Sequence, residues 1–131
     1  MTEQIKFRAY SKERKKIHEV ACINYVTKQV GSIMYKYKTQ QRTGYTHDWM
    51  KDVDLMRYIG LKDNNGTEIY EDDIVECFDG EYYFTGIVTY SPFGWYVKSK
   101  NDNISFEHFS DEISETADCK VIGNIYEAEK R

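Results

Sequence analysis

The stretch from Leu55 to Val75, LMRYIGLKDNNGTEIYEDDIV, decides the fold of this chain. It opens with a strand-like run that stops at Gly60, and the turn signal KDNNGT follows at residues 62–67. Asn-Gly supplies residues that adopt positive φ at little cost, which is typical of a tight turn between strands. The acidic turn at 71–73 then leads into a further strand. We therefore expect short strands joined by tight turns.

The polar residues of this stretch suit turn architecture better than catalysis. Gly60 and Gly66 fit turn positions, and the Asp63 carboxylate can accept backbone N–H bonds in an Asx-type turn. Asp73 stands just before Ile74, where its carboxylate could tie the turn to the next strand. We interpret these residues as structural.

Working outward toward residue 131, short strands recur every 8–15 residues between turn signals. This spacing favours an SH3-like five-stranded barrel over βαβ units. Gly86 inside the long strand predicts a bulge or sharp bend, and Gly123 predicts close backbone approach or a bulge. The expected strands are 74–78, 82–90, 95–97, 104–106 and 121–126. Residues 110–118 read as one short helical turn, and 127–131 as a frayed tail.

The half before residue 51 reads as a β-hairpin region. Strands are expected at 5–10, 17–25 and 30–37, with a polar turn at 11–16. Residues 40–52 show little periodicity and are expected to form a loop or a short helical turn. We therefore predict an all-β or β-rich α+β fold, with a basic N-terminal β-hairpin region (1–50) and an acidic SH3-like barrel (51–131). The two could equally form one compact unit.

The amino-acid composition supports a β-rich fold and limits the kinds of partner that we expect. The chain has 12 Tyr, 6 Phe, 2 Trp and one Pro, and aromatic residues suit a pleated sheet. No apolar run approaches the length of a membrane span, and no secretory leader is evident, so we expect a cytoplasmic location and no membrane partner. Residues 1–50 carry ten Lys/Arg against four Asp/Glu, whereas 51–131 carry eight against eighteen. Such a split is compatible with nucleic-acid binding, with attraction between halves or subunits, or with simple solvation.

No catalytic or metal-binding pattern emerges. Cys22, Cys77 and Cys119 form no C-x-x-C pair, and at least two of them are expected to be buried free thiols. The three histidines lie far apart, and Gly66 falls at the wrong position for a calcium loop. No phosphate-binding glycine motif occurs. We expect no enzyme activity, no cofactor, no metal and no small-molecule substrate.

Two candidate binding surfaces remain. The first is the basic turn and the second is the aromatic strand with the turn that follows it. The hypothesis of a simple barrel that binds single-stranded nucleic acid is weakened, because the basic residues and the aromatic residues belong to different halves of the chain. The candidate residues are Lys12, Arg14, Lys15 and Lys16 for the basic turn, and Tyr82, Tyr83, Phe93 and Trp95 for the aromatic strand.

The segment 55–75 closely resembles the signature of the YopX family of phage and prophage proteins. The opening IKFRAY (5–10) and the closing VIGNIYE (121–127) resemble the two ends of the same family. Where the family usually has glycine this chain has Asp72, a residue type that tolerates a left-handed turn. The resemblance implies a small β-rich phage protein of unassigned role, with no catalytic residues to carry over.

The aromatic excess, the opposite charges of the two halves and the lack of a catalytic set favour a non-catalytic protein-interaction or oligomerising module. Its partner is expected to be a second copy of the chain or a phage or host protein. The alternative is a nucleic-acid-binding accessory protein that uses the basic N-terminal hairpin, which we do not favour.

Overall fold

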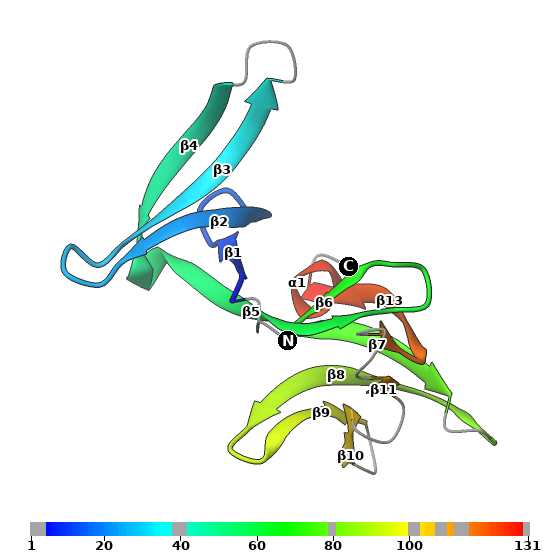
Figure 1. Ribbon diagram of the computed structural model, residues 1–131. Helices are drawn as coiled ribbons and strands as arrows, with labels where there is room; N and C mark the ends of the chain where they lie inside the picture. Colours follow the sequence, from blue (N-terminus) through cyan, green and yellow to red (C-terminus); the bar gives the residue numbers. More distant parts are fainter. Residues whose placement is uncertain are drawn as a thin grey trace. The chain divides into compact units, whose positions relative to one another are not determined.

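The computed structural model describes residues 5–37, 42–78, 81–99, 103–106, 110–111 and 116–129 (Figure 1). Contacts divide the chain into an N-terminal unit, residues 6–57, and a C-terminal unit, residues 1–5 with 58–131. The division falls inside a strand, and whether residues 1–50 form a separate domain stays a prediction. Within the described residues, no helix combines the length and the apolar character needed to cross a membrane.

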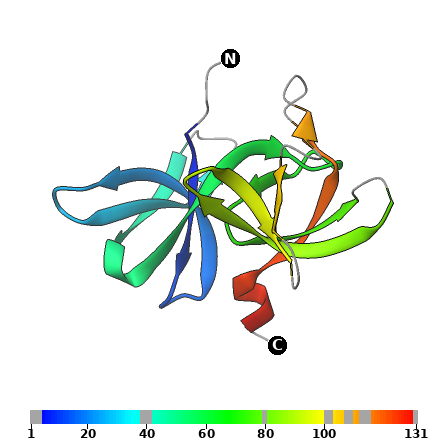
Figure 2. The ribbon, with the colours of Figure 1, turned by 90° about the horizontal axis from the view of Figure 1, so that it is seen from below.

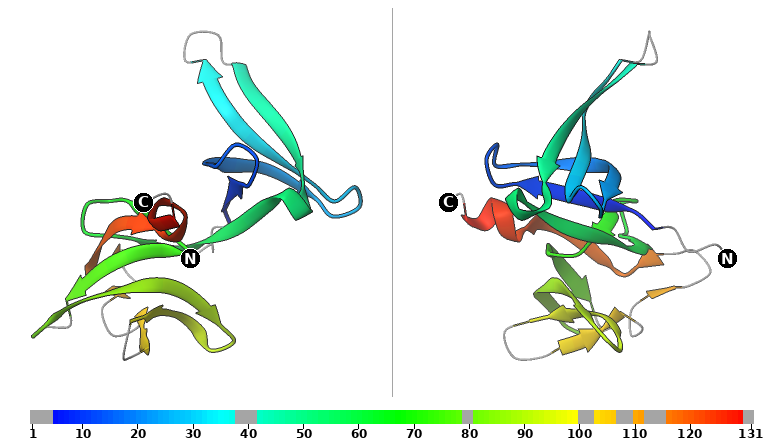
Figure 3. Two further views of the ribbon diagram at one scale, coloured as in Figure 1. Left: turned by 180° about the vertical axis from the view of Figure 1, so that it is seen from behind. Right: turned by 90° about the vertical axis from the view of Figure 1, so that its left-hand side faces the viewer.

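The N-terminal unit consists of antiparallel strands in the order β5-β1-β2-β3-β4. The β3–β4 hairpin extends well beyond β2 (Figures 1 and 3). Only the first half of β5 belongs to this unit, where Phe7 pairs with Arg57 and Ser11 with Val53. The elements are β1 (Phe7–Ser11), β2 (Lys16–Asn24), β3 (Gln29–Tyr37), β4 (Arg42–Trp49), the 3-10 turn η1 (Met50–Asp52) and β5 (Val53–Lys62).

The C-terminal unit contains a five-stranded antiparallel sheet in the order β10-β9-β8-β7-β13. Figure 2 shows β8 and β9 as one curved hairpin, with α1 following β13. Among the described residues no ladder joins β10 to β13, so hydrogen bonds do not close the predicted barrel. The elements are β6 (Glu68–Tyr70), β7 (Asp73–Phe78), β8 (Tyr83–Ser91), β9 (Gly94–Lys98), β10 (Asn103–Ser105), β11 (Ser110–Asp111), β12 (Thr116–Ala117), β13 (Cys119–Asn124) and α1 (Ile125–Glu129).

Each unit has its own cluster of buried apolar residues. The core of the C-terminal unit contains eight buried residues, namely Ile69, Val75, Cys77, Val88, Val97, Phe106, Ala117 and Cys119. The described core cluster of the N-terminal unit contains Ala9, Val30 and Val53, with partly buried neighbours around them. Met56 on β5, which belongs to the same unit, is also fully buried.

The all-β prediction is confirmed, and the five strands predicted for the C-terminal half form one sheet. Three local predictions are wrong. Residues 42–49 form β4 instead of a loop, although the expected helical turn exists as η1 at Met50–Asp52. The segments 110–111 and 116–117 pair as short strands instead of forming a helical turn. The expected last strand ends at Asn124, and α1 occupies part of the expected frayed tail.

The helix begins there because Asn124 caps it. Its Oδ1 accepts the amides of Tyr126 and Glu127, both at 3.0 Å. A side-chain oxygen at this position satisfies amides that have no partner inside the helix. The cap therefore ends the strand and starts the helix at the same residue.

Two glycines inside strands have different roles. Gly86 lies in a regular part of the β7–β8 ladder, so the bulge expected there is absent, whereas the alternative expectation, a sharp bend, stays a prediction. A Cβ at Gly86 would lie 2.5 Å from Val97 Cγ1 and 2.8 Å from the Lys98 carbonyl oxygen, which means that β9 passes too close for a side chain. At Gly123 the predicted bulge is confirmed, because the register shifts between Val121 and Gly123.

Candidate interaction surface

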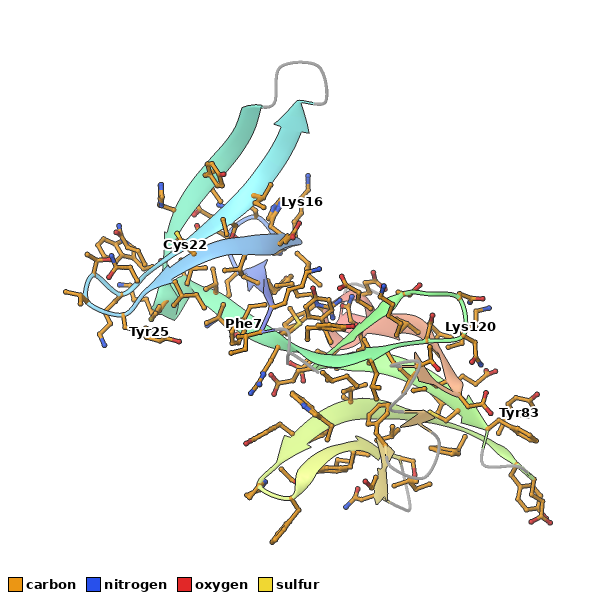
Figure 4. The ribbon with its side chains drawn as sticks, viewed as in Figure 1. Phe7, Lys16, Cys22, Tyr25, Tyr83 and Lys120 are labelled. Carbon is orange, nitrogen blue, oxygen red and sulfur yellow. The ribbon has the colours of Figure 1, made fainter. Side chains whose placement is uncertain are left out.

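The predicted basic residues all lie on the turn between β1 and β2. Lys12 Nζ donates to the Lys51 carbonyl oxygen at 3.1 Å and lies 3.7 Å from an Asp54 carboxylate oxygen. Lys15 is exposed and has φ 56°. Lys16 is also exposed and begins β2 (Figure 4). The turn thus presents lysines to solvent, but Lys12 is tied to the start of η1 and β5.

Arg14 does not point freely into solvent. Its two terminal nitrogens bind both carboxylate oxygens of Asp48, Nη1 to Oδ1 at 3.1 Å and Nη2 to Oδ2 at 2.8 Å. The hydrogen bond and the charge of Asp48 raise the pKa of Arg14. This two-point geometry is the strong form of an arginine–carboxylate pair. Arg14 therefore fastens the basic turn to β4, which removes one cation from the predicted surface.

His18 is half-buried on β2, where it pairs with Ala9 and is close enough to Arg14 and Lys16 to be affected by their charges. Its pKa is lowered from the usual value near 6.5, chiefly because burial disfavours the charged ring, and further because Arg14 and Lys16 are positive. The Asp48 charge and a hydrogen bond with the Ile33 backbone act in the opposite direction. The neutral ring is thus the form that fits the folded N-terminal unit.

The predicted aromatic surface is not brought together. Tyr83, which begins β8, is 72% exposed (Figure 4), and Tyr82 just before it is 67% exposed. Phe93 lies beyond the other end of β8 and is 99% exposed. Nine residues form β8, so at about 3.3 Å per residue its ends lie roughly 25 Å apart. Trp95 is half-buried and packs edge-on against Tyr90, with ring centroids 5.2 Å apart. Tyr82 and Tyr83 are therefore exposed at one end of β8, Phe93 is exposed beyond the other end, and Trp95 packs against Tyr90.

Sequence reasoning missed a third aromatic surface, on β4. Tyr45, His47 and Trp49 are all exposed, with Tyr45 at 56% and Trp49 at 52%, and we name them the β4 aromatic face. The residues between them are half-buried, among them Asp48, which binds Arg14. The alternation Y-T-H-D-W over 45–49 was the available signal for this strand.

A hollow lies at the end of β4. The Met50 amide donates to the Lys28 carbonyl oxygen at 2.8 Å, which joins the β2–β3 turn to η1. In that turn Tyr25 is 68% exposed and Val26 is 92% exposed (Figure 4). The hollow has a volume of about 520 Å³ and is lined by Lys28, Trp49, Met50 and Lys51. Apolar and aromatic side chains therefore extend from the β4 aromatic face to this turn.

The three cysteines are free thiols in different settings. Cys77 and Cys119 are buried and face each other across the β7–β13 ladder, whereas Cys22 is exposed on β2. The prediction of at least two buried thiols is confirmed. A hydrogen bond with the Cys119 thiol, together with burial, raises the pKa of Cys77. A thiol with a raised pKa is a poor nucleophile, so this buried pair suits packing.

The described residues contain no group of three or more His, Cys, Asp and Glu side chains that could hold a metal ion. No residue of the two predicted surfaces combines a nucleophile with a nearby base. The arrangement offers aromatic contact area, lysines and a hollow, which can support binding to another molecule.

The sequence model of the family described as YopX protein matches residues 6–131. The chain belongs to the YopX family. The chain is also similar to a solved structure, the crystal structure of protein EF1440 from Enterococcus faecalis, with 20% sequence identity and a TM-score of 0.63. The match covers 98% of each chain, and at this identity it shows a shared fold. No curated protein matches.

The YopX signature at 55–75 has a structural role in the described residues. Asp63 is 2% exposed, and its Oδ1 accepts the amides of Asn65 and Thr67 in the predicted Asx-type turn. Asp73 is 1% exposed and accepts the Tyr70 amide at 2.8 Å, so it ties the end of β6 to β7. Asp72 has φ 70°, the left-handed conformation expected where the YopX family usually has glycine.

Proposed function

We propose that this protein is a non-catalytic phage or prophage accessory protein that acts as an oligomerising module in the cytoplasm of a bacterial host. Membership of the YopX family supports the phage association. The surface that we propose for self-association is the β4 aromatic face with the adjoining hollow. Its proposed occupant is a second copy of the chain.

One observation carries this proposal: the N-terminal unit exposes large apolar side chains at the end of β4 and in the β2–β3 turn. Trp49, which lines the hollow, and Tyr25 and Val26, which lie in the turn, are each more than half exposed. Aromatic side chains are enriched where protein surfaces meet, and contiguous exposed patches of them mark interaction sites. Covering this face would remove these exposed apolar side chains from water.

The electrostatics of the face suit a second copy. Tyr45, His47 and Trp49 include no carboxylate and no ammonium group. In a two-fold dimer the same patch meets itself, which a neutral aromatic patch permits. Lys28 and Lys51 line the adjoining hollow, so in such a dimer their ammonium groups would lie at the edge of the interface, in contact with solvent. The lysines of the basic turn belong to a different part of the unit, where Arg14 and Lys12 already have acidic neighbours.

The test is sedimentation of the purified full chain over a range of concentrations. We expect a dimer or larger assembly that Trp49→Ser weakens by about 10-fold or more, since truncating an aromatic at an interface typically costs over 1 kcal/mol. Phe93→Ser is the control, because it removes an aromatic side chain that is even more exposed, at 99%, from the C-terminal unit. A wild-type chain that is monomeric at all concentrations overturns the proposal.

The alternative function, nucleic-acid binding through the basic hairpin, is separated by a second measurement. Binding through lysines to phosphates falls steeply with salt. The alternative would be favoured by two results together. The wild-type chain would be monomeric and would shift the mobility of DNA or RNA at low salt, and the Lys15→Ala, Lys16→Ala double variant would lose that shift. Capture from infected lysate with and without nuclease then distinguishes a phage or host protein from nucleic acid.

A further inference from the structure

Cys22, Gly31 and His47 stand in one row across three neighbouring strands of the N-terminal unit. Cys22 on β2 pairs with Gly31 on β3, and Gly31 pairs with His47 on β4. Figure 4 shows Cys22 where these three strands lie side by side. Residues paired in this way across a sheet have side chains on the same face, so the thiol and the imidazole share a face.

The glycine between them brings the two side chains together. A Cβ built on Gly31 would lie 2.7 Å from Cys22 Sγ, 3.6 Å from His47 Nδ1 and 3.7 Å from His47 Cε1. The thiol thus leans into the space that a side chain at residue 31 would fill, and it faces the imidazole there. Both Cys22 and His47 are exposed, so the space between them opens to solvent.

A thiolate and an imidazole nitrogen are the ligands that Zn²⁺ prefers in proteins, at about 2.3 Å and about 2.0 Å. One chain supplies two ligands, whereas structural zinc sites are four-coordinate. Cys22 and His47 of one chain therefore supply half of the ligands of a four-coordinate zinc site.

We propose that Cys22 and His47 form a half-site for Zn²⁺, which the same pair of a second copy completes across the β4 aromatic face. This inference rests on the self-association proposed above, because the second copy contributes the other two ligands. Zn²⁺ displaces the thiol proton of each Cys22 into solvent when it binds, so the affinity falls as the pH falls. His47 belongs both to the half-site and to the aromatic face.

The test uses Co²⁺ as a spectroscopic probe for zinc on the reduced full chain. We expect a thiolate-to-cobalt charge-transfer band that saturates at one Co²⁺ per two chains and is abolished in Cys22→Ser and in His47→Ala. Cys77 and Cys119 are buried and are left unchanged in every variant. A band that remains in Cys22→Ser would therefore come from these two thiols and not from Cys22. No band, or a band that survives in Cys22→Ser, overturns the inference.

Gly31→Ala tests the geometry without removing a ligand. The new methyl carbon would occupy the position 2.7 Å from Cys22 Sγ and push the thiol aside. We expect Co²⁺ affinity to fall by about 10-fold, the scale on which groups that orient metal ligands act. Unchanged affinity in Gly31→Ala contradicts the proposed geometry.

The same experiment separates this inference from the proposed function. Sedimentation is run with Zn²⁺ and with a chelator. Assembly in the chelator without any Co²⁺ band supports the oligomerising module and rejects the half-site. Assembly that appears only with Zn²⁺, and that Cys22→Ser removes, supports both. A Co²⁺ band from a monomer with one metal per chain rejects the shared site.

Discussion

The amide of Val121 donates a 2.9 Å hydrogen bond to Asp63 Oδ2 across 58 positions of sequence. The other oxygen of the same carboxylate accepts the amides of Asn65 at 2.9 Å and Thr67 at 2.8 Å. Asp63 is almost fully buried. This one carboxylate therefore holds the turn after β5 and fastens it to β13.

Replacing Asp63 should destabilise the C-terminal unit. We expect Asp63→Ala to lower the free energy of unfolding by about 3 kcal/mol, because amide donors left without a partner cost roughly 1–3 kcal/mol each when buried. Urea unfolding measures the change. Asn64→Ala is the control, since it removes one exposed bond to Asp118. Equal effects of the two variants would contradict the role of Asp63.

Gly86→Ala should destabilise the β8–β9 hairpin. The added methyl group meets Val97, which is fully buried, and the carbonyl oxygen of Lys98. A backbone atom cannot move aside without disturbing the ladder, so we expect a loss of about 1–3 kcal/mol, the usual cost of overpacking. Thr85→Ala, at the exposed neighbouring position, should change stability by less than about 0.5 kcal/mol. Thermal unfolding of both variants gives the comparison.

Asp72→Gly should stabilise the protein. Asp72 has φ 70°, a conformation that costs a residue with a Cβ roughly 1–2 kcal/mol relative to glycine. Its backbone bonds, from its own amide to Val88 and from the Ile125 amide to its carbonyl, do not depend on the side chain. We expect a gain of about 0.5–1 kcal/mol in chemical denaturation. Asp72→Val, which is β-branched, should lower stability, and the reverse order would contradict the strain.

His18 should make the N-terminal unit sensitive to acid. Its pKa is lower in the folded chain than in the unfolded chain, where it is near 6.5. The unfolded chain therefore binds the proton more readily, so stability is lost as the pH falls below about 6.5 and is present above it. We expect the wild type to lose more stability between about pH 7.5 and about pH 5 than His18→Asn does. If the wild type and His18→Asn lose the same stability over this pH range, His18 does not contribute to the acid sensitivity.

The local chemistry of the signature was predictable from the sequence because it depends on near neighbours. Asn65-Gly66 makes a turn whatever surrounds it, and Gly66 has φ 81° as that turn requires. The Asx-type bonds of Asp63 were likewise expected, since their partners lie two and four residues away. Val121, the third partner, could not be identified, because its approach depends on the pairing of β13 with β7.

The missed features share a physical cause: each depends on what lies opposite in space. Gly86 was interpreted as a bulge or a sharp bend because the sequence does not show that β9 approaches it. The strand β4 was missed because its outward residues are aromatic and its inward residues are polar, with Asp48 matched by Arg14 from a distant turn. The cap at Asn124 is the one missed feature whose residues are near neighbours in sequence. It was overlooked because the apolar run before it favoured a longer strand.

The ladder between β7 and β13 also has a consequence for the order in which the chain folds during synthesis. In the N-terminal unit most ladders join consecutive strands, so they can form while later residues are still inside the ribosome. The core of the C-terminal unit needs Cys119 beside Cys77 and Val121 beside Asp63. Contacts of such long sequence separation form late. Until β13 emerges, the nascent chain exposes one edge of β7 and depends on its first fifty-odd residues for order.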